Sequence, residues 1–139
     1  MSTPPLPDET IALLRKPNPS TITTLRSDGQ PVSAATWYLW DDGVVLVNMD
    51  EGRKRLGHLR RDPRVSLTVL DAADWYTHVT LIGRVTELRD DPGLVDIDRL
   101  AQHYLGSPYP DRERSRVTAV VEIDRWHGWG SQKDNTQAG

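Results

Sequence analysis

The sequence has 139 residues, which is enough for one domain with a hydrophobic core and too few for two. The absence of cysteine excludes disulfides, thiolate zinc sites and cysteine nucleophiles, and no apolar run approaches the roughly 20 residues that cross a bilayer. The formal net charge of −3 argues against nonspecific nucleic-acid binding by the whole surface. We therefore expect a cytoplasmic protein with no membrane and no nucleic acid among its partners.

The N-terminal half of the chain is predicted to contain an arm, a helix and three strands. Residues 1–7 hold three prolines and are expected to form the arm, while acidic residues after Pro7 and basic residues before Pro17 indicate a helix between them. β-branched and apolar runs separated by Asp-Gly turns predict strands at residues 21–25, 31–40 and 44–49. We expect these three strands to pair as a meander.

A short basic helix is predicted over residues 50–61, where Leu56 and Leu59 lie three apart. Three cations fall at its beginning: Arg53, Lys54 and Arg55. The helix dipole and the free backbone N–H groups favour an anion at that end, so a bound phosphate would account for the cations. Asp50 and Glu51 could instead neutralise them internally, and a solvated basic face is a third interpretation.

The C-terminal half is predicted to contain three strands and one helix. The strands are expected at residues 65–70, 75–88 and 117–123. Gly83 interrupts the second of them and predicts a bulge or a close backbone approach, and a helix is expected to start near Pro92 and to end at Gly106. Six strands with short helices indicate an antiparallel barrel, which we expect over residues 8–130, followed by a flexible tail at residues 131–139.

The segment at residues 52–67 carries a resemblance to a known family. It reads Gly-Arg-Lys-Arg-Leu-Gly-His-Leu-Arg-Arg-Asp-Pro-Arg-Val-Ser-Leu and resembles the phosphate-binding helix and following strand of the split β-barrel flavin/deazaflavin oxidoreductases. This superfamily includes pyridoxamine 5'-phosphate oxidase-like proteins and actinobacterial enzymes that use coenzyme F420. The order of elements over residues 8–130 is similar to the family as well. His58 departs from the family pattern, which commonly has Asn at that position.

The resemblance implies a fold, an assembly and a set of cofactor-binding residues. The fold is mainly β (α+β), a six-stranded antiparallel split β-barrel with peripheral short helices, and the assembly is a homodimer with the cofactor site near the interface. The cationic cluster Arg53, Lys54 and Arg55 would hold the cofactor phosphate. The ring would lie against small strand residues and a strand end: Ser33, Ala34, Ala35, Thr36, Asn48 and Met49. Trp75 would be an aromatic near the cofactor or an anchor of the interface.

From the residues alone, two of these assignments have ordinary alternatives. A flat tricyclic ring can approach a backbone closely only where side chains are small, but from the sequence alone ordinary core packing is the more common reason for small residues at 33–36. Four of the tryptophans could wall a substrate pocket or belong to the core: Trp37, Trp40, Trp126 and Trp129.

No sequence pattern assigns a catalytic acid, base or nucleophile. The chain has no Gly-x-Ser-x-Gly motif, and its four histidines are not spaced as metal ligands, so we expect no metal site and leave the catalytic residues unassigned. An enzyme of this kind takes its chemistry from a cofactor that the protein binds and orients.

The C-terminal half bears on the identity of the cofactor. True pyridoxamine phosphate oxidases carry a C-terminal Trp-Arg signature for the vitamin phosphate, whereas residues 125–130 read Arg-Trp-His-Gly-Trp-Gly, so that substrate is not expected. Arg112, Arg114 and Arg116 suit a cofactor with a long anionic tail. Together with the resemblance to the actinobacterial branch, they favour an F420-dependent oxidoreductase that transfers hydride between the cofactor and a conjugated or heteroaromatic small molecule. An FMN-binding oxidase or reductase of the same fold and a non-catalytic flavin or deazaflavin carrier or sensor are the alternatives.

Overall fold

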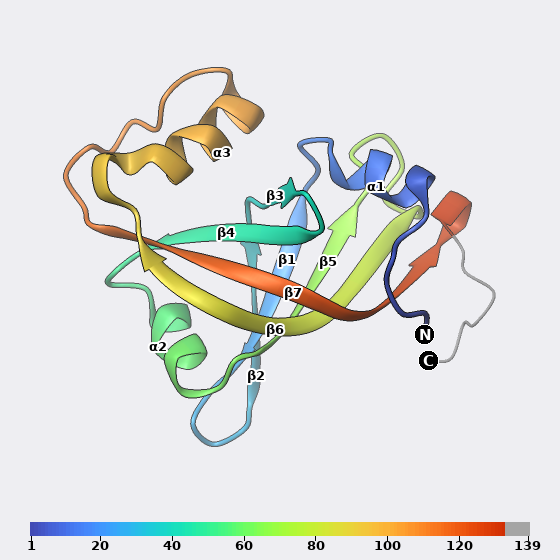
Figure 1. Cartoon of the computed structure of the whole chain (residues 1–139), viewed down its shortest axis with the longest axis horizontal. Coiled ribbons are helices and arrows are strands. Elements are labelled where there is room, and N and C mark those ends of the chain that lie inside the picture. Colours follow the sequence, from blue (N-terminus) through green and yellow to red (C-terminus); the bar gives the residue numbers. More distant parts are fainter. Residues whose placement is uncertain (133–139) are drawn as a thin grey trace.

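Seven strands form one antiparallel sheet in the computed structural model of the protein, which describes residues 1–132. The strands are β1 (Ser20–Leu25), β2 (Pro31–Thr36), β3 (Leu39–Asp41), β4 (Val44–Asp50), β5 (Arg64–Leu70), β6 (His78–Asp90) and β7 (Arg116–Trp129). The helices are α1 (Asp8–Leu14), α2 (Lys54–Arg61) and α3 (Val95–Leu105), with 3-10 turns η1 (Pro92–Leu94) and η2 (Gly130–Gln132). Figure 1 shows the helices around the margins of the sheet. None of the described helices is long and apolar enough to cross a membrane.

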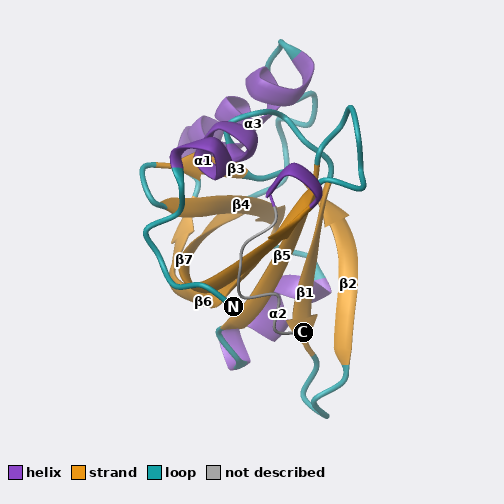
Figure 2. Ribbon diagram, turned by 90° about the vertical axis from the view of Figure 1, so that its right-hand side faces the viewer, coloured by secondary structure: helices purple, strands orange, loops and turns teal. Residues whose placement is uncertain are grey.

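The strand order is β2-β1-β5-β6-β7-β4-β3, so β2 and β3 are the two edges. The sheet curls around its core without closing (Figure 2). The predicted mainly β, antiparallel split-barrel architecture is therefore confirmed, although the described residues form seven strands rather than six.

The predicted meander of the first three strands is wrong, because the segment 31–40 is not one strand. β2 pairs with β1, whereas β3 pairs with β4 at the other edge. The break falls at Trp37 and Tyr38, where the Tyr38 ring is fully buried and its hydroxyl donates to the carbonyl of Lys16 over 3.0 Å. Because the Tyr38 side chain is buried in the core, the backbone leaves the edge strand β2 at this point and crosses to β3 at the opposite edge.

The predicted close approach at Gly83 is confirmed. Ile82 pairs with Arg125 and Gly83 with Ile123, so Asp124 is the extra residue of a bulge in β7. A Cβ atom at Gly83 would overlap the backbone carbonyl of Glu122. The bulge bends the two longest strands where the sheet curls.

Helix α2 starts later than predicted, since β4 continues to Asp50 and the helix begins at Lys54. The intervening turn is closed by a hydrogen bond from the Arg53 N–H to the Asp50 carbonyl, 3.1 Å, and by one from the Gly52 N–H to the Asp50 carboxylate, 2.9 Å. On the inner side, Leu56 and Leu59 are buried. The result is a short helix that places its basic beginning at a strand end.

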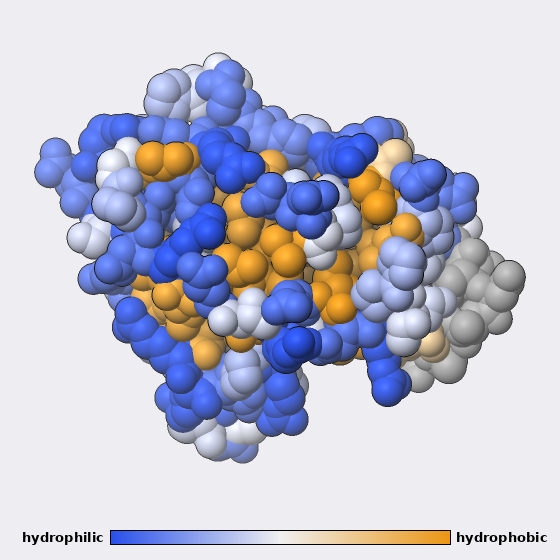
Figure 3. Space-filling model, in the orientation of Figure 1, coloured by the Kyte–Doolittle hydropathy of each residue, from blue (hydrophilic) through white to orange (hydrophobic). Residues whose placement is uncertain are grey.

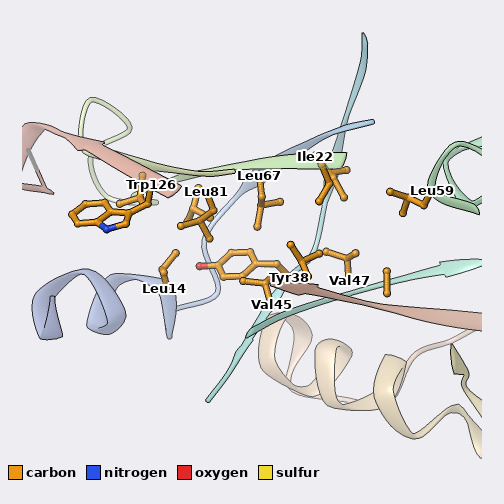
Figure 4. Packing of buried hydrophobic residues seen from close by; sticks show 14 of the residues in the cluster. Leu14, Ile22, Tyr38, Val45, Val47, Leu59, Leu67, Leu81 and Trp126 are labelled. Carbon is orange, nitrogen blue, oxygen red and sulfur yellow. The ribbon is translucent and has the colours of Figure 1, made fainter. Parts of the chain in front are cut away.

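The hydrophobic core runs the length of the curled sheet (Figure 4). β1 and β5 alternate buried and partly exposed residues, as expected for strands with one face on a core. In Figure 4, Tyr38 lies between the two walls, with Trp126 and Leu14 toward one end and Leu59 of α2 at the other. α1 and α2 thus cover opposite ends of the core.

The N-terminal segment lies against β7. The backbone of Ser2 exchanges two hydrogen bonds of 2.9 Å with the backbone of Trp126, and Leu6 is buried. The division into an arm, a domain at residues 8–130 and a tail stays a prediction, and residues 133–139 of the tail lie outside the described residues.

Apolar side chains gather at the centre of the face that carries β4, β6 and β7, and polar side chains surround them (Figure 3). Apolar areas of this kind mark surfaces suited to protein contact.

Candidate functional site

A cavity of about 520 Å³ lies where several parts of the chain meet, among them the end of β4, the beginning of α2, the inner side of α3 and the beginning of β7. These segments lie together at the left of the sheet in Figure 1. The lining consists of Pro17, Pro19, Ser20, Ala35, Thr36, Trp37, Asn48, Met49, Arg53, Arg55, Ile97, Leu100, Tyr104, Tyr109 and Arg116. The volume falls within the range of small-molecule and cofactor sites, about 300–1,000 Å³.

The charged part of this lining is entirely basic. Arg53, Arg55 and Arg116 line the cavity, and no carboxylate of the described residues does. Burial lowers the pKa of Arg55, and the neighbouring Arg53 and Arg116 lower it further, with Asp50 acting weakly in the opposite direction. The Nε atom of Arg55 is buried and has no hydrogen-bond partner among residues 1–132. An anion in the cavity would relieve both the repulsion and the unsatisfied donor.

The beginning of α2 is partly neutralised by the protein itself. Asp50 lies 3.5 Å from Arg53 and 3.6 Å from Arg114, so the internal neutralisation considered from the sequence is present for Arg53. Arg55 forms no ion pair with a carboxylate in the described part of the chain, and Asp50 acts on it only from a longer distance, as the smallest of the effects on its pKa. No side chain caps the helix.

Arg116 enters the cavity from the first position of β7. Its Nε donates to Oδ1 of Asn48 over 2.7 Å, and its guanidinium carbon lies 4.7 Å from the centre of the Tyr109 ring. Arg116 and Asn48 are 8% and 7% exposed. The amide nitrogen of Asn48 donates in turn to Oδ2 of Asp91, 3.2 Å, and to the hydroxyl of Thr118, 3.0 Å.

Asp91 connects this network to α3. Its carboxylate accepts the backbone N–H groups of Asp96 and Ile97, both at 2.9 Å, in the first turn of the helix. Thr118 of β7 also donates to Asp96 over 2.7 Å. These bonds satisfy donors at the start of α3 and hold that helix over the end of the sheet.

An aromatic wall faces the arginines. Trp37 stacks on Tyr104 with ring centres 5.2 Å apart and planes 7° from parallel, and Tyr109 meets Trp37 edge-on at 6.0 Å. The Tyr104 hydroxyl donates to the carbonyl of Asn18 over 2.7 Å, and burial raises the pKa of Tyr104 to about 12. Tyr104 is therefore neutral at physiological pH, and the wall offers flat, largely apolar surface beside a cationic one.

Six of the ten predicted cofactor-binding residues line the cavity: Ala35, Thr36, Asn48, Met49, Arg53 and Arg55. The other four do not. Ser33 and Ala34 are exposed on β2, Lys54 is exposed at the beginning of α2, and Trp75 is 72% exposed in the turn before β6. Their part in cofactor binding stays a prediction, as does that of the six.

The further arginines and tryptophans have different surroundings. Arg112 pairs with Asp98 at 2.7 Å and Arg114 pairs with Asp50 and Asp111, so of these three arginines only Arg116 lines the cavity. Among the tryptophans considered as pocket walls, Trp37 lines it, Trp126 is buried in the core, and Trp40 packs against the core.

Several lining residues were missed from the sequence, among them Pro17, Pro19, Tyr104 and Tyr109. The two prolines flank Asn18, whose side chain bonds Leu13 and Ala72 and so fixes the loop at the mouth of the cavity. Tertiary packing brings the two prolines to the same cavity as α2, and no local sequence pattern indicates this. Residues 1–132 contain no group of three or more His, Cys, Asp or Glu residues placed to hold a metal ion.

Solved structures with the same fold include an F420 reductase. It is 27% identical to this chain, with a TM-score of 0.78, and the match covers 87% of this chain and 98% of that one. A conserved hypothetical protein from Mycobacterium tuberculosis is 23% identical, with a TM-score of 0.74 and coverage of 99% and 94%. A putative pyridoxamine 5'-phosphate oxidase from Listeria innocua is 15% identical, with a TM-score of 0.67 and coverage of 87% and 95%. A search of curated proteins found no match to the sequence.

The fold is that of flavin and deazaflavin oxidoreductases. The family model described as pyridoxamine 5'-phosphate oxidase matches residues 6–130, which is nearly all of the described chain. The resemblance drawn from the basic segment at residues 52–67 is thereby confirmed, and the chain belongs to the pyridoxamine 5'-phosphate oxidase family.

Proposed function

We propose that the protein is an oxidoreductase that binds F420 in the cavity between α2, α3 and β7 and transfers hydride between this cofactor and a conjugated or heteroaromatic small molecule. The observation that carries the proposal is the cavity lining, which joins three arginines without a carboxylate to a stacked aromatic wall. A phosphate-bearing ligand with a flat ring matches both parts. The F420 reductase of the same fold supports the choice of cofactor.

The residues divide into two groups by what they would hold. Arg53 and Arg55, with Lys54 at the exposed beginning of the helix, would bind the phosphate through charge-assisted hydrogen bonds. Ala35, Thr36 and Met49 at the strand end would lie against the ring, and Asn48 would contribute through its hydrogen bond to Arg116. The unsatisfied Nε of Arg55 fits this role, because a phosphate oxygen would supply its acceptor.

The cofactor, when bound, supplies the hydride chemistry. The chain's own part is to bind, orient and exclude water. Tyr104 does not act as a base at neutral pH, since its raised pKa keeps the hydroxyl protonated and that proton is donated to the carbonyl of Asn18. Because that hydroxyl already donates to a backbone carbonyl, we do not assign Tyr104 as the catalytic proton donor either, and this role has no assigned residue.

An FMN-dependent oxidase or reductase is the second candidate, and one observation favours it. Arg112 and Arg114, which suited a long anionic tail, are engaged by Asp98, Asp50 and Asp111. Because these two arginines are already paired, they are less suited to bind a long anionic tail. The phosphate site that remains would also accept FMN.

A parallel titration of the purified protein with F420 and with FMN, followed by ligand fluorescence, tests the proposal. Tight binding of F420 alone is the expected result. Preference for FMN would replace the first candidate by the second, and binding of neither would contradict both. Oxidation of the reduced cofactor by candidate acceptors then separates an enzyme from a carrier or sensor.

The proposal includes a homodimer with the cofactor site near its interface. Five of the six residues of β2 are exposed, among them Val32, Ser33 and Ala34, and the strand is an edge of the sheet. Ala35 and Thr36 continue from this exposed strand into the cavity lining. A second protomer against β2 would cover this exposed edge, and Ser33 and Ala34 would then lie in an interface that adjoins the cavity.

A further inference from the structure

Arg116 is a buried cation whose charge is only partly balanced in the described structure, where it helps to lower the pKa of the Asp111 carboxyl. It is 8% exposed and lines the cavity, yet within residues 1–132 no carboxylate forms an ion pair with it. Its side chain contacts the amide oxygen of Asn48 and the ring of Tyr109. A buried charge without an ion-pair partner destabilises a folded protein, and binding of an anion beside it would offset this cost.

Neighbouring positive charges further destabilise the charged side chain of Arg116. Arg53 and Arg55 line the same cavity, and repulsion from Arg116 helps to lower the pKa of Arg55. Asp50, the nearest carboxylate in the register of β4 and β7, pairs with Arg53 and Arg114 instead. Three cations from two elements thus converge on one space.

Asn48 determines the direction of the Arg116 side chain. Its Oδ1 accepts Nε of Arg116 at 2.7 Å, while its amide nitrogen is held by Asp91 and Thr118. A guanidinium fixed through Nε still has two terminal NH₂ groups, and these form a fork suited to two oxygens of a phosphate.

We propose that Arg116 is a third anion-binding residue of the cavity, contributed by β7, and that Asn48 is its positioning residue. The group it takes is the phosphate of the ligand, bound between the beginnings of α2 and β7. This inference rests on the proposed function, because it assigns a further residue to the same site.

Ligand titrations of matched variants test the inference. Arg116→Met removes the charge at similar volume and is expected to weaken binding of F420 or FMN by about 10-fold or more. Asn48→Ala should weaken binding by less, and the double variant should bind no more weakly than Arg116→Met alone, because Asn48 acts through Arg116. Arg125→Met, on the same strand but exposed and outside the cavity lining, is the control and should leave affinity unchanged.

The stability of the ligand-free protein separates this role from a structural one. Removal of an unpaired buried charge should leave the urea midpoint of Arg116→Met equal to or above that of the wild type, although its affinity is lower. A lower midpoint with unchanged affinity would overturn the inference. Arg116→Lys keeps the charge but loses the bond to Asn48, so it should bind with intermediate affinity, and adding Asn48→Ala to it should have no further effect.

The outcomes distinguish this inference from the proposed function. Wild-type affinity in Arg116→Met, together with loss of binding in Arg53→Ala/Arg55→Ala, would overturn the inference and leave the function standing. If the wild type binds neither cofactor, the proposed function fails, and calorimetry with inorganic phosphate decides the inference alone. Phosphate binding that weakens in Arg116→Met supports it, and equal binding or none overturns it.

Discussion

Arg53 and Arg55 differ in how much of their charge the protein already balances. Arg53 lies 3.5 Å from Asp50, while Arg55 has a buried Nε without a partner among the described residues. We expect Arg53→Ala/Arg55→Ala to weaken cofactor binding by about 3 kcal/mol, on the order of 100-fold, since hydrogen bonds to charged groups are strong. Fluorescence titration measures the loss.

The matched control for this variant lies on the same helix. Arg60 and Arg61 are exposed and outside the cavity lining, so Arg60→Ala/Arg61→Ala removes the same charge without removing a predicted contact. Equal affinities of the two double variants would show that the basic segment acts only through its overall field. Urea unfolding of both should stay close to the wild type.

Tyr104 predicts a dependence of stability on alkaline pH. Burial raises the pKa of its hydroxyl from 10.0 to about 12 and also raises the pKa of Tyr38. The unfolded chain therefore loses these protons at lower pH than the folded one, and the free energy of unfolding should be constant below about pH 9 and fall from about pH 10 toward pH 12.

Urea unfolding at a series of alkaline pH values measures this slope. Tyr104→Phe should have a shallower slope than the wild type, because one of the two buried hydroxyls is gone. Tyr76→Phe, at an exposed position, is the control and should keep the wild-type slope. A slope that Tyr104→Phe leaves unchanged would contradict the assignment.

At the scale of elements, structural features that depend only on neighbouring residues can be predicted from the sequence. Gly106 ends α3 in the left-handed conformation, with φ of 74° and its N–H bonded to the Gln102 carbonyl over 3.0 Å. The end of β4 and the beginning of α2 are consecutive in the chain, and the residues that the resemblance assigns there, Asn48, Met49, Arg53 and Arg55, line one cavity.

Features that depend on distant packing were not predictable in the same way. The break of segment 31–40 depends on a core that accepts Tyr38, and the residues around it are otherwise typical of a continuous strand. Tyr104 and Tyr109 join the site because Asp91 and Asn48 hold α3 over the sheet end. No local pattern states which helix covers that end.

Two glycines, Gly83 at the bulge between β6 and β7 and Gly57 in α2, have opposite predictions for stability. Gly83→Ala would place a Cβ against the Glu122 carbonyl, so it should lower the free energy of unfolding by about 1–3 kcal/mol or more. Gly57→Ala, within α2 and with open space around the added Cβ, should raise it by about 0.5–1 kcal/mol. Urea unfolding of both variants tests the pair, and destabilisation by Gly57→Ala would show that α2 is constrained by more than its backbone.

At the scale of the whole molecule, the exposed edge strand β2 predicts self-association. Light scattering should show twice the mass of one chain for the wild type. Ala34→Arg, which places a charge at the centre of β2, should shift the mass toward that of one chain and weaken cofactor binding at the same time.

Ser107→Arg adds the same charge in the exposed loop after α3 and is the control for this prediction. It should leave both mass and affinity unchanged. A monomeric wild type with full cofactor affinity would contradict the proposed dimer while leaving the cavity and its ligand untouched.

The crossing of the chain between β2 and β3 makes the assembly of the sheet non-local. Residues 37–38 connect the two outermost strands, and β1 finds its second neighbour only in β5, which pairs residues 20–23 with residues 66–69. Proteins dominated by such distant pairings fold slowly, in about milliseconds to seconds, because loop closure precedes the contacts that reward it. The hairpins β1–β2, β3–β4 and β5–β6 pair residues close in sequence, so we expect them to form first. The pairings of β1 with β5 and of β4 and β6 with β7 join distant residues and should form last.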